Sequence, residues 1–327
     1  MNEFRLTRRQ PLRFGLAAAA LALAGPALHA QTWPAKPIQI VVPFPAGGIV
    51  DNVARAMLPK LTTSLGQPLV IDNKAGAGGS IGTAQVAKAK ADGYTLLMAF
   101  DTHVVNPMLY KLSFDSEKDL TPVALVGTSP LIVVVPKDSP ANSLKELVAM
   151  AKSKPGVLNF ASTGAGSSNQ LAAELFKTTA GVEMTHVPYK GGAPAITDVL
   201  GGRVDVMFVS APSVLTHIKA GTMKALAVTT RERIAQLPEV PTVGETYPGY
   251  EVQSWVGMLA PGKTPPDIVK RLNAEVRAAL QVPETKALLQ AQALRLASGG
   301  PEDFGHFLQV EGERWGAVIR KANIKVD

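Results

Sequence analysis

The feature that most constrains this chain is an order that repeats four times: a short apolar run, a glycine-rich loop with almost no charge, and a helical pattern. The four loops are residues 43–48, 73–80, 162–168 and 188–193. Glycine lets the backbone come close to a ligand, and the first N–H groups of the helix that follows attract anions because they have no intrahelical partner. The repeated order therefore predicts several anion-binding helix N-termini.

Eight short apolar runs are candidate buried strands: 38–42, 69–71, 94–99, 131–135, 158–161, 204–209, 226–229 and 256–259. They are mostly continuous, which is typical of parallel strands covered on both faces. Helical periods lie between them, as in Val50–Leu61 and Leu144–Ala151, and two more helices are predicted to begin at Thr264–Pro266 and Gly300–Pro301. Strands and helices alternate as in a doubly wound α/β fold.

Two segments are extended without helical periodicity, Thr128–Leu131 and Tyr250–Val256, and we interpret them as two connections between lobes. Residues 31–129 and 252–327 are then expected to form one lobe, and residues 130–251 the other. Two glycine loops fall in each lobe, so they could face each other across a cleft at the carboxyl ends of strands, where open α/β sheets bind ligands.

The first 30 residues have the pattern of a secretory signal. Arg5, Arg8, Arg9 and Arg13 precede an apolar stretch at 14–28, and Ala30 offers a small residue for cleavage. The stretch is shorter than the ~20 residues that a membrane span needs. We expect an exported, soluble protein cleaved after Ala30, with Ala24 as the alternative; the twin-arginine and general export routes both stay open.

The composition excludes several functions. Loss of residues 1–30 removes four Arg and one Glu, which lowers the net charge from +7 to +4, and the remaining Lys and Arg form no basic run. Nucleic acid is therefore not an expected partner. The chain has no Cys, and the four His after the leader are far apart, so we expect neither a metal nor another cofactor. These histidines are His103, His186, His217 and His306.

Two kinds of motif suggest an enzyme, but the residues around each of them do not fit the structure that the motif needs. Gly78–Gly82 matches a nucleophile elbow around Ser80, but eight loop residues separate Ser80 from the preceding strand, so a serine at a helix N-cap is the better interpretation. No loop ends in Gly-Lys-Ser/Thr, and Ile81 and Asn169 occupy the third glycine place of the dinucleotide pattern. Asp51 is expected to cap the first helix. We therefore predict no catalytic residues; an exported serine hydrolase using Ser80 is kept as an alternative.

Further motifs resemble those of the Bug-type receptors, which are extracytoplasmic solute-binding proteins of tripartite tricarboxylate transporters. The resemblance extends along the chain after the leader, in order. Its motifs are Lys36-Pro37-Ile38, residues 42–48 with Asp51 and Ala54-Arg55, residues 73–79, residues 118–123, residues 162–167, residues 187–195, residues 237–242 and Arg314-Trp315.

The resemblance implies an α/β, two-lobed periplasmic binding protein of type II, with a ligand cleft between the lobes. It implies a small carboxylate ligand held without a salt bridge, a membrane permease as partner or, alternatively, a sensor, and a location in the periplasm; we expect a monomer. The binding roles that it implies fall on Phe44, Gly47, Gly48, Gly78, Gly79, Ser80, Ser162, Thr163, Gly164, Gly166, Ser167 and Lys190.

Two residues depart from the family pattern. Gln170 stands where a His is expected, and Val209 stands near the expected cleft where many members have an acidic residue. If that acidic residue contacts a ligand amino group, its absence points to a ligand without one.

Overall fold

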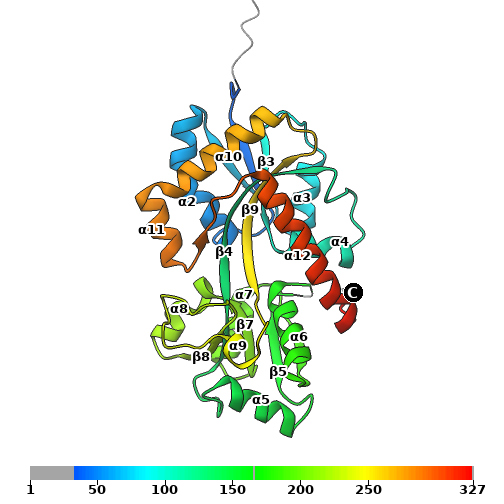
Figure 1. The fold of residues 1–327 in the computed structure, drawn as a ribbon, viewed down its shortest axis with the longest axis vertical. Helices are drawn as coiled ribbons and strands as arrows, with labels where there is room; N and C mark the ends of the chain where they lie inside the picture. Colours follow the sequence, from blue (N-terminus) through cyan, green and yellow to red (C-terminus); the bar gives the residue numbers. More distant parts are fainter. Residues whose placement is uncertain (1–32, 165, 326–327) are drawn as a thin grey trace, which may run out of the picture.

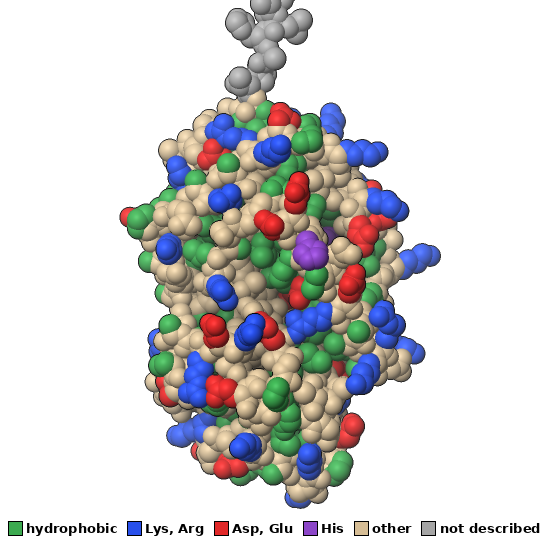
Figure 2. Space-filling view, viewed as in Figure 1, with side chains coloured by type: hydrophobic (Ala, Val, Ile, Leu, Met, Phe, Trp, Pro, Cys, Tyr) green, Lys and Arg blue, Asp and Glu red, His purple; other side chains and the backbone are tan. Residues whose placement is uncertain are grey.

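The computed structural model describes residues 33–164 and 166–325, and it shows two bodies joined by long strands (Figure 1). The predicted leader lies outside the described residues. The joining strands are β4 (Leu120–Pro136) and β9 (Gln253–Pro261). Charged side chains of both signs are interspersed over the face that Figure 2 shows. Within the described residues, no helix is long and apolar enough to cross a membrane.

The upper body in Figure 1 is built on β2 (Leu69–Asn73), β1 (Ile38–Val42) and β3 (Thr95–Phe100), which are parallel, followed by β9 and β4. β9 is antiparallel to both β3 and β4, and the short β10 (Arg295–Leu296) also pairs with β4. An apolar core joins one face of this sheet to α2 (Ile49–Leu65), α10 (Pro266–Gln281) and α11 (Pro283–Ala291). A second core, on the opposite face of the sheet, contains side chains from α3 (Ser80–Ala87), α4 (Thr102–Leu109) and α12 (Pro301–Ala322).

The lower body is built on the parallel strands β6 (Thr185–Pro188), β5 (Asn159–Ser162) and β7 (Val206–Ser210). The end of β4 pairs antiparallel with β7 on one side and with β8 (Met223–Val228) on the other. One core contains α5 (Leu144–Ser153) and α6 (Ser168–Ala180). Another contains α7 (Gly192–Leu200) and α8 (Ala211–Lys219), and the short α9 (Val243–Thr246) precedes the return strand β9.

Strand β4 belongs to both bodies. Its residues from Leu120 to Pro130 pair with β9, and from Leu131 onward it pairs with β7 and β8. The change of partner falls within the predicted connection at Thr128–Leu131. The lobe boundaries after residues 129 and 251 stay a prediction, and the change of partner in β4 supports the first of them.

All eight predicted strand regions contain a strand, but the expectation of parallel pairing is wrong for β4, β8 and β9. Apolar runs show that a strand is buried on both faces and say nothing of its direction. The first part of β4 was missed because register shifts near Pro122 and Leu125 interrupt the pattern. β6 was missed because none of its residues is fully buried. The two C-terminal helices begin at Pro266 and Pro301, as predicted.

Helix α12 packs along both bodies. Near its start Phe304 contacts Trp255 of β9, with ring centroids 5.6 Å apart. Further along, Trp315 and Ile319 join the core that contains Phe176 of α6. Phe304 and Trp315 are each 1% exposed, so both side chains serve packing.

Two glycines test this packing. A Cβ on Gly257 of β9 would collide with the Phe304 ring, whereas a Cβ on Gly312 of α12 would meet nothing within 4 Å. Gly257→Ala is expected to lower the free energy of unfolding by about 1–3 kcal/mol through overpacking. Gly312→Ala is expected to raise it by about 0.5–1 kcal/mol, because alanine is the better helix former. Urea unfolding of the two variants measures both; equal effects would contradict the close contact between α12 and β9.

Candidate ligand-binding site

Each of the four glycine loops leads into a helix, as predicted. The helices α2, α3, α6 and α7 begin at Ile49, Ser80, Ser168 and Gly192. The N-caps of α2, α3 and α7 are glycines, which have no side chain to accept from the first turn. Ser80 is the first residue of α3 and not its N-cap, which corrects the N-cap interpretation by one position. Such helix starts present N–H groups to an anion.

The loops at 43–48 and 73–80 contact each other. The Asn73 amide donates to the Phe44 carbonyl at 3.0 Å and to the Asp51 carboxylate at 3.1 Å. At Gly79 the backbone comes so close to the Phe44 ring that a Cβ there would lie 3.2 Å from the nearest ring carbon. The two loops of the upper body therefore form one surface.

Asp51 lies in the first turn of α2, where its charge suits the helix start as predicted, and it accepts from the N–H of Gly47, just before the N-cap Gly48. It is 2% exposed and accepts from the Gly47 N–H at 2.9 Å and from Arg55 Nε at 2.8 Å, besides Asn73. Burial acts to raise the pKa of Asp51, but the hydrogen bonds from Arg55, Gly47 and Asn73 outweigh it and keep the pKa below its usual value. Asp51 therefore stays ionised and its oxygens are used within the protein.

The loops at 162–168 and 188–193 are joined through Ser162. Its hydroxyl lies 2.6 Å from His186 Nε2 and accepts from the Gly164 N–H at 3.2 Å, while its carbonyl accepts from the Tyr189 N–H at 3.0 Å. The His186 ring stacks on Phe160, and burial lowers the pKa of His186 to about 4, so the imidazole is neutral near pH 7. Ser162 is 0% exposed, so its hydroxyl shapes the loop.

Two amide side chains that the sequence did not mark as site residues fix the third loop. Asn169 accepts from the Thr163 hydroxyl at 2.7 Å, and Gln170 accepts from the Gly166 N–H at 2.8 Å. The Ser167 hydroxyl, at the N-cap of α6, donates to the Gly164 carbonyl at 2.7 Å. Gln170, which replaces an expected His, thus has a role in the loop.

Helix α4 lies between the two pairs of loops. Thr102 Oγ1 and Asn106 Nδ2 both donate to the Gly78 carbonyl, at 2.8 and 2.9 Å. On the other side, Gly166 packs so tightly against Leu109 that a Cβ there would collide with it. The loop at 73–80 and the loop at 162–168 therefore contact the same helix, which no apolar pattern in the sequence predicts.

The twelve predicted residues are brought into two groups, one in each body. Gly47, Gly48 and Lys190 are exposed, Gly79, Ser162 and Gly166 are buried, and the other six are partly buried. No hydrogen bond or ion pair joins Lys190 to another residue in the described part of the chain. The second departure, Val209, is 2% exposed within an apolar core, so at that place the chain has no carboxylate for a ligand amino group.

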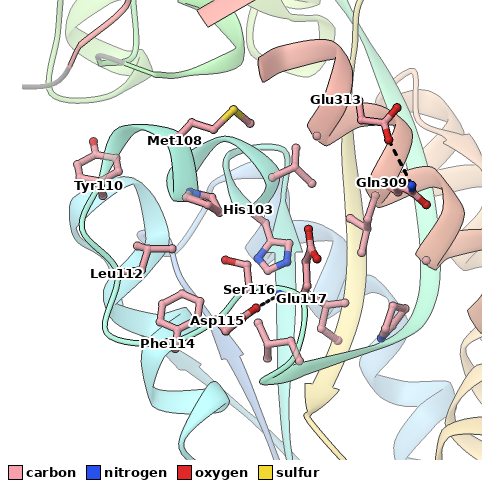
Figure 3. Close-up of a pocket in the computed structure, with 18 residues that line it drawn as sticks. His103, Met108, Tyr110, Leu112, Phe114, Asp115, Ser116, Glu117, Gln309 and Glu313 are labelled. Atoms are coloured by element: carbon pink, nitrogen blue, oxygen red, sulfur yellow. Dashed lines mark hydrogen bonds between the residues drawn. The ribbon is translucent and has the colours of Figure 1, made fainter. Parts of the chain in front are cut away.

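A cavity of about 1140 Å³ lies elsewhere, between α4, the segment that follows it and α12 (Figure 3). None of the twelve predicted residues lines it. Its described lining includes Asp115, Glu117 and Glu313 and no Lys or Arg. This charge would repel a carboxylate, so the glycine loops are the better site for one.

The sequence model of the family described as "Tripartite tricarboxylate transporter family receptor" matches residues 53–324. The chain belongs to this receptor family. Its relatives include the protein BugT of Bordetella pertussis, which is 39% identical over 319 residues, covering 95% of this chain and 97% of BugT. The predicted resemblance to Bug-type receptors is therefore confirmed.

Several solved structures that are similar to this chain share its fold. The periplasmic binding protein BugD has a TM-score of 0.81 and 34% identity, covering 90% of this chain and 99% of BugD. Rpa4515 of R. palustris, solved with adipate, has a TM-score of 0.83 and 37% identity, covering 90% and 99%. MatC of Rhodopseudomonas palustris, solved with bound malate, has a TM-score of 0.80 and 33% identity, covering 88% and 100%. The predicted α/β periplasmic binding protein fold is confirmed.

The lowered pKa of Asp51 predicts how the free energy of unfolding changes in acid. Because its pKa is lowered in the folded state, its contribution is present at neutral pH and is lost as the pH falls below about 4, through the folded-state pKa. Asp51→Ala is expected to lower the free energy of unfolding by about 2 kcal/mol at pH 7. The difference from wild type should shrink in acid.

Urea unfolding at pH 7 and in steps below pH 4 measures this difference. Asp138→Ala is the control, since Asp138 is an exposed turn residue, and should change stability by less than about 0.5 kcal/mol. An Asp51 effect that does not vary with pH would contradict the role of its charge.

Proposed function

We propose that the chain is a monomeric periplasmic receptor that captures a small dicarboxylate or related organic acid between its two lobes and delivers it to a membrane permease. The observation that carries this proposal is that four helix starts follow glycine loops, two in each body, with α4 in contact with a loop of each. Solved relatives hold adipate and malate, which are both dicarboxylates.

The ligand is held by N–H and hydroxyl donors rather than by a cation, so the binding role predicted for Lys190 falls on its backbone N–H. Lys74 Nζ lies 3.4 Å from Asp72 Oδ1, and Arg55 pairs with Asp51, so these cations are used within the protein. Charge-assisted hydrogen bonds contribute about 1.5–3 kcal/mol each. Five such bonds contribute ~10 kcal/mol of favourable interaction free energy, whereas micromolar affinity requires a net binding free energy of about 8 kcal/mol. Closing the lobes and ordering the loops and the ligand cost free energy, which reduces this favourable term.

A catalytic role is not part of the proposal. The serine paired with a histidine in the described structure is Ser162, with His186, and its side chain has no exposed surface. Ser80 lies at the start of α3 instead, where it suits a hydrogen bond to a ligand.

The receptor should shift its melting temperature with its ligand. The protein is unfolded in denaturant, refolded and screened against adipate, malate, aromatic acids and acidic amino acids. A ligand at 1,000 times its dissociation constant stabilises by about 4 kcal/mol, a shift of many degrees. A melting temperature unchanged by every carboxylate would contradict the proposal.

A matched pair of glycine variants tests the site. Gly47 and Gly221 both have positive φ, +81° and +68°, and a Cβ on either meets nothing within 4 Å. Gly47→Leu and Gly221→Leu should therefore destabilise the fold alike. We expect Gly47→Leu alone to abolish binding of the screened ligand in calorimetry, because its side chain enters the loop surface. Equal affinities in the two folded variants would contradict the site.

We also propose export with cleavage after Ala30. The periplasmic fraction of cells expressing the full chain should contain a mature protein that begins at Gln31 by N-terminal sequencing. A start at Gly25 would favour the alternative cleavage, and an intact N-terminus in the cytoplasm would contradict export.

A further inference from the structure

Asp101 is a buried carboxylate that the ligand site does not explain. It is 3% exposed, and neither of its oxygens has a hydrogen-bond partner among the described residues. It lies between the end of β3 and the start of α4. A buried charge without a partner is costly, so such a group favours a proton.

The surroundings of Asp101 are polar and belong to the strands that join the two bodies. The hydroxyls of Ser254 on β9 and Ser168 on α6 are 3.4 Å apart, and both influence the Asp101 carboxyl. Ser129 on β4 is the register partner of Ser254, and its buried hydroxyl also has no hydrogen-bond partner in the described part of the chain. Four polar side chains are thus gathered where both bodies and both joining strands meet.

Asp101 also lies between two of the ligand loops. The residue after it, Thr102, donates to the carbonyl of Gly78 in the loop at 73–80. Ser168 directly follows Ser167, the N-cap that ends the loop at 162–168. An anion held by these two loops would therefore be close to the buried carboxylate.

Few charges face this carboxylate. β3, β4 and β9 contain no titratable side chain. On α6, Glu174 pairs with Lys177 at 2.9 Å. On α4, burial lowers the pKa of His103 to about 4, so this ring is neutral.

On α12, Glu311 is buried and accepts from Trp315 Nε1 at 2.9 Å and from Arg314 at 3.3 Å. Burial, with a smaller repulsion from Glu311, raises the pKa of Asp101 to about 7. The hydroxyls of Ser168 and Ser254 and the Thr102 N–H lie near the carboxyl without reaching hydrogen-bond geometry, and they lower the pKa of Asp101 by less than burial raises it.

We propose that Asp101 takes up a proton from solvent when an anionic ligand binds between the lobes. The inference rests on the proposed function. A bound carboxylate brings a second negative charge near a carboxylate that is already poorly solvated, and closure removes water from both. The added proton forms an O–H bond on Asp101, which then donates to a neighbouring oxygen.

The coupling has a definite sign. Well below pH 7 Asp101 is already protonated in the free protein, so binding takes up no proton and affinity does not change with pH. Above pH 7 each binding event must first add the proton, so affinity falls as pH rises, by at most about tenfold per pH unit for one proton.

The experiment is calorimetry of adipate and malate binding at pH 7.5 in two buffers with different ionisation enthalpies, followed by affinity measurements from pH 6 to 8.5. Wild type should take up a substantial fraction of one proton per ligand and lose affinity above pH 7. Asp101→Asn keeps the shape without the charge, so it should bind with no proton uptake and with an affinity independent of pH.

Glu284→Gln, which changes an exposed carboxylate on α11, is the control and should behave as wild type. Equal heats in both buffers for wild type would overturn the inference, as would proton uptake that persists in Asp101→Asn. Binding without proton uptake leaves the receptor proposal standing. Failure of every carboxylate in the screen to bind would overturn both.

A second measurement does not depend on the folding of the variant. Carbon-13 NMR of the Asp101 carboxyl in wild type should show titration near pH 7 without ligand and a protonated carboxyl at pH 8 with saturating ligand. An ionised carboxyl at pH 8 in the complex would overturn the inference.

Discussion

The pairing of β4 with β9 is the constraint on which the rest of the structure depends. It extends from Leu120 opposite Pro261 to Pro130 opposite Gln253, and β4 then continues without a break into the second sheet. Because one strand belongs to both sheets, the carboxyl ends of β1 and β5, and the glycine loops that follow them, are placed by the same backbone.

Binding through uncharged donors sets the chemistry of the site. Asp51 and Asn73 hold one pair of loops, and Ser162 and His186 hold the other, so these polar side chains are used to fix the backbone. The loops can then present N–H groups without reorganisation, which limits the entropy lost on binding. Among the causes that shift the pKa of Asp101 in the described structure there is no cation, and this is why we propose that the carboxyl responds to an added anion.

The sequence predicted the strand regions, the helix starts and the glycine loops well, because apolar runs and glycines act locally. It could not predict strand direction, since the antiparallel strand β9 is as apolar as the parallel strands β1 and β3. It also did not predict α4. Thr102 and Asn106 of this helix donate to the Gly78 carbonyl only because the fold places α4, directly after β3, next to the loop at 73–80. The roles of Asn169, Gln170 and Asp101 depend on long-range contacts or on burial in the same way.

The most direct test of the account is a crystal structure of the mature protein with the carboxylate that gives the largest shift in melting temperature. The account predicts that its oxygens lie within hydrogen-bond distance of N–H groups in the loops of both lobes, with no Lys or Arg side chain within 4 Å. A ligand held by a salt bridge, or one seated in the cavity between α4 and α12, would contradict it.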